Sequence, residues 1–120
     1  MPNTLPLVYA CSGCSNVAQL ANDIALKLTR ENKAEMSCIA GVGGKVRSLV
    51  KQARSGRPII AIDGCALHCA KQCLANIDMS ADLHLTLTDH RLRKRKHEAF
   101  DDDDLETAYR IVLNEMDNRL

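Results

Sequence analysis

Short apolar runs alternate along the chain with longer segments in which apolar residues recur at helical spacing. The apolar runs are expected to form β-strands over residues 5–10, 35–40, 58–62 and 82–88. Between the first two runs, Val17, Leu20 and Ile24 recur every three or four positions, which is the period of an amphipathic helix. By the same criterion, helices are expected over residues 16–32, 45–54 and 66–77, and from residue 101 onward.

Residues that commonly begin, end or separate helices support these boundaries. Ser15 can cap the first helix, and the glycine-rich residues 41–44 predict a turn before the second one. The acidic run 101–104 places negative charge in the first turn of the last helix, where the helix dipole favours it. The alternation of strands and helices therefore extends to the end of the chain.

This alternation predicts an α/β fold. Strands that alternate with helices of ten or more residues form right-handed βαβ units, which build a mainly parallel sheet. We expect a small three-layer domain of about four strands flanked by helices, with the strand order 2-1-3-4. The chain has no internal repeat or linker, so residues 1–120 are expected to form a single domain.

Composition and charge narrow the classes of function. Hydrophobic residues make up 46% of the chain and charged residues 26%, which is typical of a globular protein. No apolar run is long enough to cross a membrane. The net charge is +1, and the basic run 91–96 has no interleaved aromatic residues for stacking on bases. We therefore expect neither a nucleic acid nor a membrane as a partner.

The cysteines are the unusual part of the composition, with six in 120 residues. The N-terminal residues have no basic segment, and their apolar stretch is too short for a signal peptide. We therefore expect a cytoplasmic protein. Because the cytosol keeps thiols reduced, metal binding or thiol chemistry is favoured over a disulfide scaffold.

Five of the cysteines follow or end predicted strands. Cys11 and Cys14 come after the first strand, Cys38 lies near the end of the second, and Cys65 and Cys69 follow the third. The C-terminal ends of parallel strands open at one edge of the sheet, so these thiols are expected to converge there. Cys65 and Cys69 are also expected on one face of a helix at its N-terminus, where the dipole stabilises a thiolate.

Thiolates that converge at one edge of a sheet indicate a zinc site. A structural or storage site for zinc needs four thiolate or imidazole ligands in a tetrahedron. We expect the cofactor to be Zn²⁺ and the partner to be this metal ion. The expected ligands are Cys11, Cys38, Cys65 and Cys69, with Cys14 replacing one of them or remaining free.

Neighbouring residues have simpler interpretations. Cys73 is expected to pack in the interior, and His68 to be a solvated or hydrogen-bonded side chain. Asp63 either caps the third helix or supports the site as a carboxylate, and Gly64 allows a tight turn or a close backbone approach to a ligand. Surface positions are expected for the remaining histidines, His84, His90 and His97.

Two other functions use the same thiols. A thiol oxidoreductase or sulfur-transfer enzyme would employ Cys11 or Cys65 as the nucleophile and Cys14 or Cys69 as the resolving thiol. An iron–sulfur protein would employ the thiolates as cluster ligands. Whether the protein is an enzyme stays open at this point.

The sequence IDGCALHCAK around Cys65, together with Cys11-Ser-Gly, QLAN at 19–22 and MSCIAG at 36–41, resembles a known family. This is the DGC family of small bacterial and archaeal proteins, named for its Asp-Gly-Cys motif and described as zinc-binding. The resemblance covers most of the chain and implies zinc binding, with no reaction implied. The family's typical cysteines match Cys11, Cys38, Cys65 and Cys69, whereas Cys14 and Cys73 are additions in this sequence. We expect a zinc-binding protein that holds the metal for transfer, sensing or chemistry.

Overall fold

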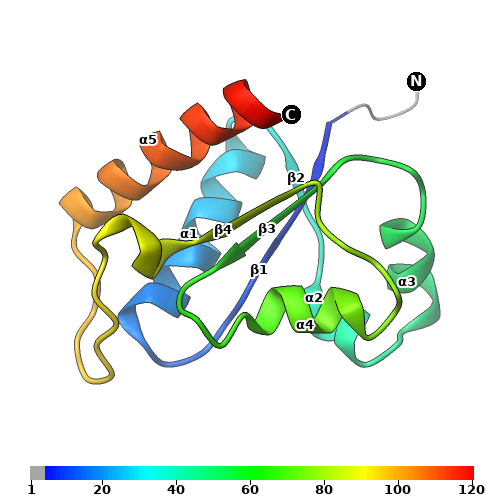
Figure 1. Cartoon of the computed structure of the whole chain (residues 1–120), viewed down its shortest axis with the longest axis horizontal. Coiled ribbons are helices and arrows are strands. Elements are labelled where there is room, and N and C mark those ends of the chain that lie inside the picture. Colours follow the sequence, from blue (N-terminus) through cyan, green and yellow to red (C-terminus); the bar gives the residue numbers. More distant parts are fainter. Residues whose placement is uncertain (1–4) are drawn as a thin grey trace.

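A parallel β-sheet lies at the centre of the computed structural model, which describes residues 5–120 (Figure 1). Within these residues, the sheet consists of β1 (Leu7–Ala10), β2 (Glu35–Met36), β3 (Ile59–Asp63) and β4 (Leu83–Thr86). The strands lie in the order β2-β1-β3-β4, and each neighbouring pair is parallel. The predicted α/β class and strand order are confirmed.

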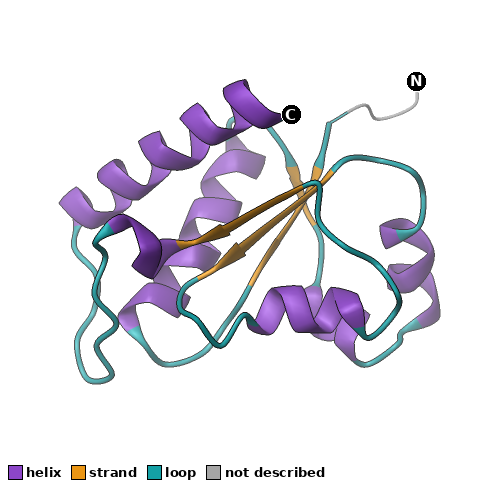
Figure 2. Cartoon of the chain, viewed as in Figure 1, coloured by secondary structure: helices purple, strands orange, loops and turns teal. Residues whose placement is uncertain are grey.

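Helices cover both faces of the sheet (Figure 2). On one face, α1 and α5 pack together, and on the other face α2, α3 and α4 lie side by side. A short 3₁₀ helix, η1, follows β4. The bounds are α1 (Asn16–Arg30), α2 (Ile39–Gly43), α3 (Arg47–Ala53), α4 (Cys69–Ala75), η1 (Leu87–His90) and α5 (Asp102–Arg119).

The central strands are apolar along their whole length because both of their faces are covered. Every residue of β1 and β3 is buried. Helix α1 contributes Leu20, Ile24 and Leu28 to the same core, each with at most 1% of its surface exposed. The core therefore holds the C-terminal ends of β1 and β3 in fixed positions, and the loops that carry the cysteines begin there.

The helix caps predicted from the sequence are present. Ser15 caps α1, with its hydroxyl oxygen accepting a hydrogen bond from the Ala18 amide at 3.2 Å. Asp101 caps α5 and forms a reciprocal capping box with Asp104. Within residues 5–120, no helix is both long and apolar enough to span a membrane. The expected lack of a signal peptide concerns a segment that includes residues 1–4, which lie outside the described residues.

The prediction for residues 35–44 was partly wrong. Strand β2 ends at Met36, and the expected end of the strand together with the expected glycine turn forms α2 instead. Cys38 caps this helix, since its Sγ accepts a hydrogen bond from the Gly41 amide at 3.4 Å. A short apolar run has no clear periodicity, so the sequence pattern did not separate a buried helix from a strand.

The predicted start of the third helix was also wrong. Helix α4 begins at Cys69, after His68 adopts a left-handed backbone conformation with φ of 54°. The Asp63 carboxylate accepts hydrogen bonds from the amides of Ala70 at 2.7 Å and Lys71 at 3.2 Å, so it caps α4 from the end of β3. Cys65 lies in the preceding turn and does not share a helix face with Cys69.

Candidate functional site

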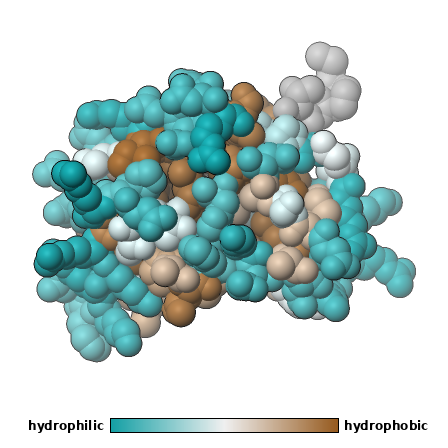
Figure 3. Space-filling model, in the orientation of Figure 1, coloured by the Kyte–Doolittle hydropathy of each residue, from teal (hydrophilic) through white to brown (hydrophobic). Residues whose placement is uncertain are grey.

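The C-terminal ends of β1 and β3 open on a pocket of about 170 Å³ that is lined by thiols. We call it the cysteine pocket, and its thiols are those of Cys11, Cys14, Cys65 and Cys69. Two segments that are far apart in the sequence meet here, as the parallel-sheet argument predicted. The turn between β3 and α4 also exposes hydrophobic surface at this edge (Figure 3), where Leu67 is 68% exposed.

Cys11 is the buried thiol of the cysteine pocket. Only 7% of its surface is exposed, and its Sγ accepts a hydrogen bond from the Gly64 amide at 3.1 Å. Burial raises the pKa of the Cys11 thiol to about 11, and the nearby Asp63 carboxylate acts in the same direction. At neutral pH and without a metal, Cys11 is therefore a protonated thiol.

The other thiols of the cysteine pocket are more accessible. Cys14 and Cys69 are exposed, and Cys65 is half-buried. The ammonium group of Lys94 lies 3.4 Å from the Cys65 Sγ, and Lys96 lines the same pocket. Positive charge therefore lies beside the sulfur atoms.

A close contact between α1 and the turn after β3 fixes the two cysteine-bearing segments together. A Cβ atom on Gly64 would come within 2.7 Å of the backbone carbonyl of Val17 and 2.9 Å of the Ala18 amide. Only glycine allows the chain to pass this close. The turn expected at Gly64 is present, and the close backbone approach there is to α1 rather than to a ligand.

Cys38 lies apart from the cysteine pocket, so its expected convergence with the other four thiols was wrong. It lines a separate surface pocket with Leu26, Met36 and Leu49. The chain turns into α2 directly after β2, and this places Cys38 at the cap of that helix. Its role as a metal ligand stays a prediction.

Within residues 5–120, no group of three or more histidine, cysteine or acidic side chains is arranged to hold a metal ion. The thiols of the cysteine pocket therefore share a pocket without forming a preset coordination sphere. Cys73 is half-buried against α2, where a Cβ on Gly43 would lie 2.9 Å from its Sγ. Cys73 therefore packs against α2 but is not part of the interior, so the packing predicted for it is confirmed only in part.

A histidine pair supports the turn that carries Cys65 and Cys69. The fully buried Asp63 carboxylate contacts the His84 Nε2 at 2.8 Å. The His68 Nε2 lies 3.0 Å from the Thr86 hydroxyl oxygen, and the His68 and His84 rings meet edge to face with centroids 4.9 Å apart. The helix-capping role predicted for Asp63 and the hydrogen-bonded role predicted for His68 are both confirmed.

The surface position predicted for His84 was wrong. His84 pairs with Ala61 in the register of β3 and β4, and Thr86 pairs with Asp63. Side chains two residues apart on a strand share a face, so His84 and Thr86 lie on the Asp63 face of the sheet. The alternation of Leu83 and Leu85 with His84 is visible in the sequence, but the strand register that relates it to Asp63 is not.

The basic segment 91–96 is attached to the start of α1. The Asn16 amide donates to the Arg95 carbonyl at 2.9 Å, and its side chain donates to the Arg93 carbonyl at 2.8 Å. The Asn16 side-chain oxygen also accepts from the Arg95 amide at 2.5 Å. The segment is exposed apart from the half-buried Leu92, and it places Lys94 and Lys96 beside the thiols.

Fold and site together define a class of protein, an α/β domain with an Asp-Gly-Cys turn at the C-terminal edge of its sheet. The sequence model of the DGC domain matches residues 7–112, so the chain belongs to the DGC domain family, and the resemblance seen in the sequence is confirmed. A curated relative is the anaerobic and virulence modulator AnvM of Pseudomonas aeruginosa. It is 64% identical over 105 residues, which cover 88% of this chain and 80% of the relative. No solved structure gives a significant match.

Proposed function

We propose that this protein binds one zinc ion through the thiolates of Cys11, Cys14, Cys65 and Cys69 and acts as a regulatory sensor of metal or redox conditions. The observation that carries the proposal is the convergence of these thiols on one pocket from two distant segments. The name of AnvM describes a modulator of anaerobic and virulence functions. A regulatory role for its relative agrees with a thiol site that responds to oxidation.

The chemistry of the donor set fits zinc. Four thiolates are a common ligand set for Zn²⁺, and together with the metal they carry a net charge of about −2. The ammonium groups of Lys94 and Lys96 at the same pocket offset part of that charge. When bound, zinc supplies a cross-link between thiolates that is itself redox-inert, and oxidation of the sulfur atoms breaks it.

The environments of the thiols suggest how the site closes. Cys11 is held by the Gly64 amide, and Cys65 is held beside Lys94. Cys14 and Cys69 are exposed and line the same pocket, and the proposal requires their side chains to turn toward the other two. Cys11 must lose its proton to become a ligand, so zinc binding should release protons and weaken as the pH falls.

The test is zinc affinity in single cysteine variants of the full chain, measured by competition with a chromophoric chelator. Cys65→Ser should lower the zinc affinity by about 100-fold or more, because a thiolate ligand is lost. Cys38→Ser and Cys73→Ser are the matched controls and should bind zinc as the wild type does. If Cys38→Ser loses zinc as Cys65→Ser does, the ligand set proposed here is wrong.

A count of reactive thiols gives independent support. About four thiols should become reactive only after a chelator removes the zinc. Free zinc at 100 times its dissociation constant should add about 2.7 kcal/mol to the free energy of unfolding. The midpoint temperature of thermal unfolding should therefore rise when zinc is added. Visible absorption after anaerobic purification would instead indicate an iron–sulfur cluster.

A second candidate function is thiol–disulfide exchange in the metal-free protein. It is favoured by the exposed Cys14 and Cys69 in the same pocket as the Lys94-paired Cys65. The pKa of Cys11 makes this thiol a poor nucleophile, so Cys65 is the better candidate. Oxidation with glutathione disulfide should produce one defined disulfide among these residues in a mass map. Random pairing would contradict this function.

A further inference from the structure

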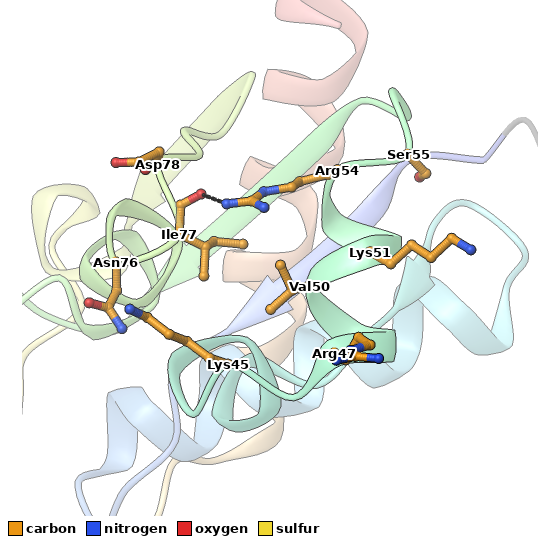
Figure 4. Close-up of a pocket in the computed structure, with 9 residues that line it drawn as sticks. All are labelled: Lys45, Arg47, Val50, Lys51, Arg54, Ser55, Asn76, Ile77 and Asp78. Carbon is orange, nitrogen blue, oxygen red and sulfur yellow. Dashed lines mark hydrogen bonds between the residues drawn. The ribbon is translucent and has the colours of Figure 1, made fainter.

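A second and larger cavity lies at the other end of α4 (Figure 4). Its volume is about 740 Å³, and α3 and the turns at residues 45 and 76–78 line it. None of its described lining residues lines the cysteine pocket. Small-molecule sites typically have volumes of about 300–1,000 Å³, so this cavity has the size of a binding site for a metabolite.

The rim of this cavity is positively charged. Lys45, Arg47 and Lys51 line it, and within residues 5–120 none of the three has an ion pair or a side-chain hydrogen bond. Arg54 donates one hydrogen bond to the Ile77 carbonyl at 2.8 Å, which extends the guanidinium across the cavity. In Figure 4, Lys45 reaches toward the 76–78 turn from the opposite end.

Acidic side chains contribute little charge to the cavity compared with the basic ones. Asp78 lines the cavity, but Figure 4 shows its side chain directed away from Lys45 and Arg54. Lys45 and Arg54 therefore face the cavity without an acidic neighbour between them, whereas Lys51 is directed away from it in Figure 4. Such a concentration of uncompensated charge attracts an anion.

The floor of the cavity is apolar. Val50 of α3 is half-buried and Ile77 is 3% exposed, and their side chains lie between Lys45 and Arg54 in Figure 4. Binding sites for small molecules commonly combine an apolar lining with a few polar groups that fix orientation. This cavity has both parts.

We propose that the cavity binds a small anionic molecule with an apolar body. Lys45 holds its phosphate or carboxylate group, with Arg47 at the rim, and the apolar body lies against Val50 and Ile77 on the way to Arg54 at the opposite end. This site is separate from the proposed zinc site, and neither proposal depends on the other.

The test uses two fluorescent probes that share a ring system. 8-Anilinonaphthalene-1-sulfonate carries an anionic group, and N-phenyl-1-naphthylamine lacks it. The full chain should bind the sulfonate at one saturable site and bind the neutral probe about tenfold more weakly, a difference of about 1.4 kcal/mol, because the neutral probe makes no charged hydrogen bond. Affinity for the sulfonate should also fall as salt concentration rises.

Substitutions of residues that line the cavity test whether the sulfonate binds there. The double variant Lys45→Gln, Arg47→Gln should weaken binding of the sulfonate about tenfold, because it removes two cations that have no structural partner. The control double variant Arg110→Gln, Arg119→Gln makes the same charge change at two i,i+4 pairs on α5 and should leave affinity unchanged. Val50→Asp should weaken binding by placing an anion on the floor. Thermal unfolding curves confirm that each variant is folded.

Amide chemical shifts give an outcome that does not depend on the variants. Addition of the sulfonate should give its largest shifts in the amide signals of residues 45–55 and 76–78. Equal affinities for the two probes, unchanged affinity in the double variant, or shifts confined to residues outside the cavity would overturn the proposal.

Discussion

Asp63 is the buried charge on which the Asp-Gly-Cys turn depends. No part of its side chain is exposed, and its carboxylate oxygens contact two amides of α4 and the ring of His84. A buried carboxylate is tolerated only when such partners satisfy it. Its role at the site is therefore to fix the start of α4, and with it the position of Cys69.

We expect Asp63→Asn to lower the free energy of unfolding by about 3 kcal/mol, because the amide has one acceptor oxygen and turns an N–H group toward other donors. Urea unfolding measures this loss. Asp117→Asn, an exposed position on α5, should change stability by less than about 0.5 kcal/mol. Equal stability of the two variants would show that the Asp63 hydrogen bonds contribute nothing.

Tyr109 connects α5 to the end of α1. Its hydroxyl donates a hydrogen bond to the Glu31 carboxylate at 2.6 Å, and burial, with the nearby Glu31 charge, raises the pKa of the phenol above its ordinary value of 10.0. A group whose pKa is raised by folding stabilises the native state below its unfolded pKa. This stabilisation is lost as the pH rises above that value.

Tyr109→Phe should therefore lower the free energy of unfolding by about 1 kcal/mol at pH 8. Above pH 10, the variant should lose less stability with rising pH than the wild type does. Urea unfolding between pH 8 and pH 11 measures both effects. Burial also raises the pKa of Tyr9, but Tyr9 is present in both proteins and its effect cancels in the comparison. Parallel pH profiles would contradict the assignment to Tyr109.

At the scale of single residues, the sequence predicted the thiols better than the groups around them. The convergence of Cys11, Cys14, Cys65 and Cys69 follows from one rule about parallel strands. The position of Cys38 depends on where a short strand gives way to a helix, and the role of His84 depends on strand register. Both are tertiary properties that spacing along the chain does not carry.

At the scale of elements, the turn between β3 and α4 is held by its contact with the first turn of α1. Gly64→Ala should lower stability by about 3 kcal/mol or more, because its Cβ would meet backbone atoms of Val17 and Ala18 that have no room to move. Unfolding by urea, followed by circular dichroism, measures the loss.

Gly43→Ala is the matched control for this prediction. Its Cβ would meet the Cys73 Sγ at 2.9 Å, which is a side chain that can rotate, and alanine favours the helix over glycine. We expect a cost of about 1 kcal/mol or less. Equal costs for the two variants would show that the backbone contact at Gly64 is not tight in solution.

The elements that sequence reasoning placed correctly are those with strong periodicity or clear caps. The helix from Asn16 and the strands around β1 and β3 belong to this group. The start of α4 was missed because it depends on the left-handed conformation of His68 and on capping by Asp63, seven residues before Ala70. Helix α2 was missed because its glycines, which usually indicate a turn, serve close packing against neighbouring helices.

At the scale of the whole molecule, Asn16 attaches the basic segment 91–96 to the edge of the sheet that carries the thiols. Three hydrogen bonds join Asn16 to Arg93 and Arg95, and two of them are made by the Asn16 side chain. We therefore expect Asn16→Ala to lower the free energy of unfolding by about 2 kcal/mol and to release this segment. Limited trypsin digestion with mass mapping should then show about tenfold faster cleavage within residues 91–96.

Asn114→Ala, at an exposed position on α5, serves as the control and should digest as the wild type does. Unchanged cleavage of residues 91–96 in Asn16→Ala would show that other contacts hold the segment. It would also remove the structural reason for the positions of Lys94 and Lys96 beside the thiols.

Helix α4 lies between the two pockets. It begins at Cys69, which lines the cysteine pocket, and the turn 76–78 that follows it lines the larger cavity. With seven residues it is only about 10 Å long, and its buried Ala70 and Leu74 pack it on the sheet as one rigid piece. A ligand that displaces this helix at one end changes the affinity for the ligand at the other. By thermodynamic linkage the second ligand then changes the affinity for the first by the same factor. Under the two proposals, the supply of one small anion would shift the metal concentration at which the thiols become occupied.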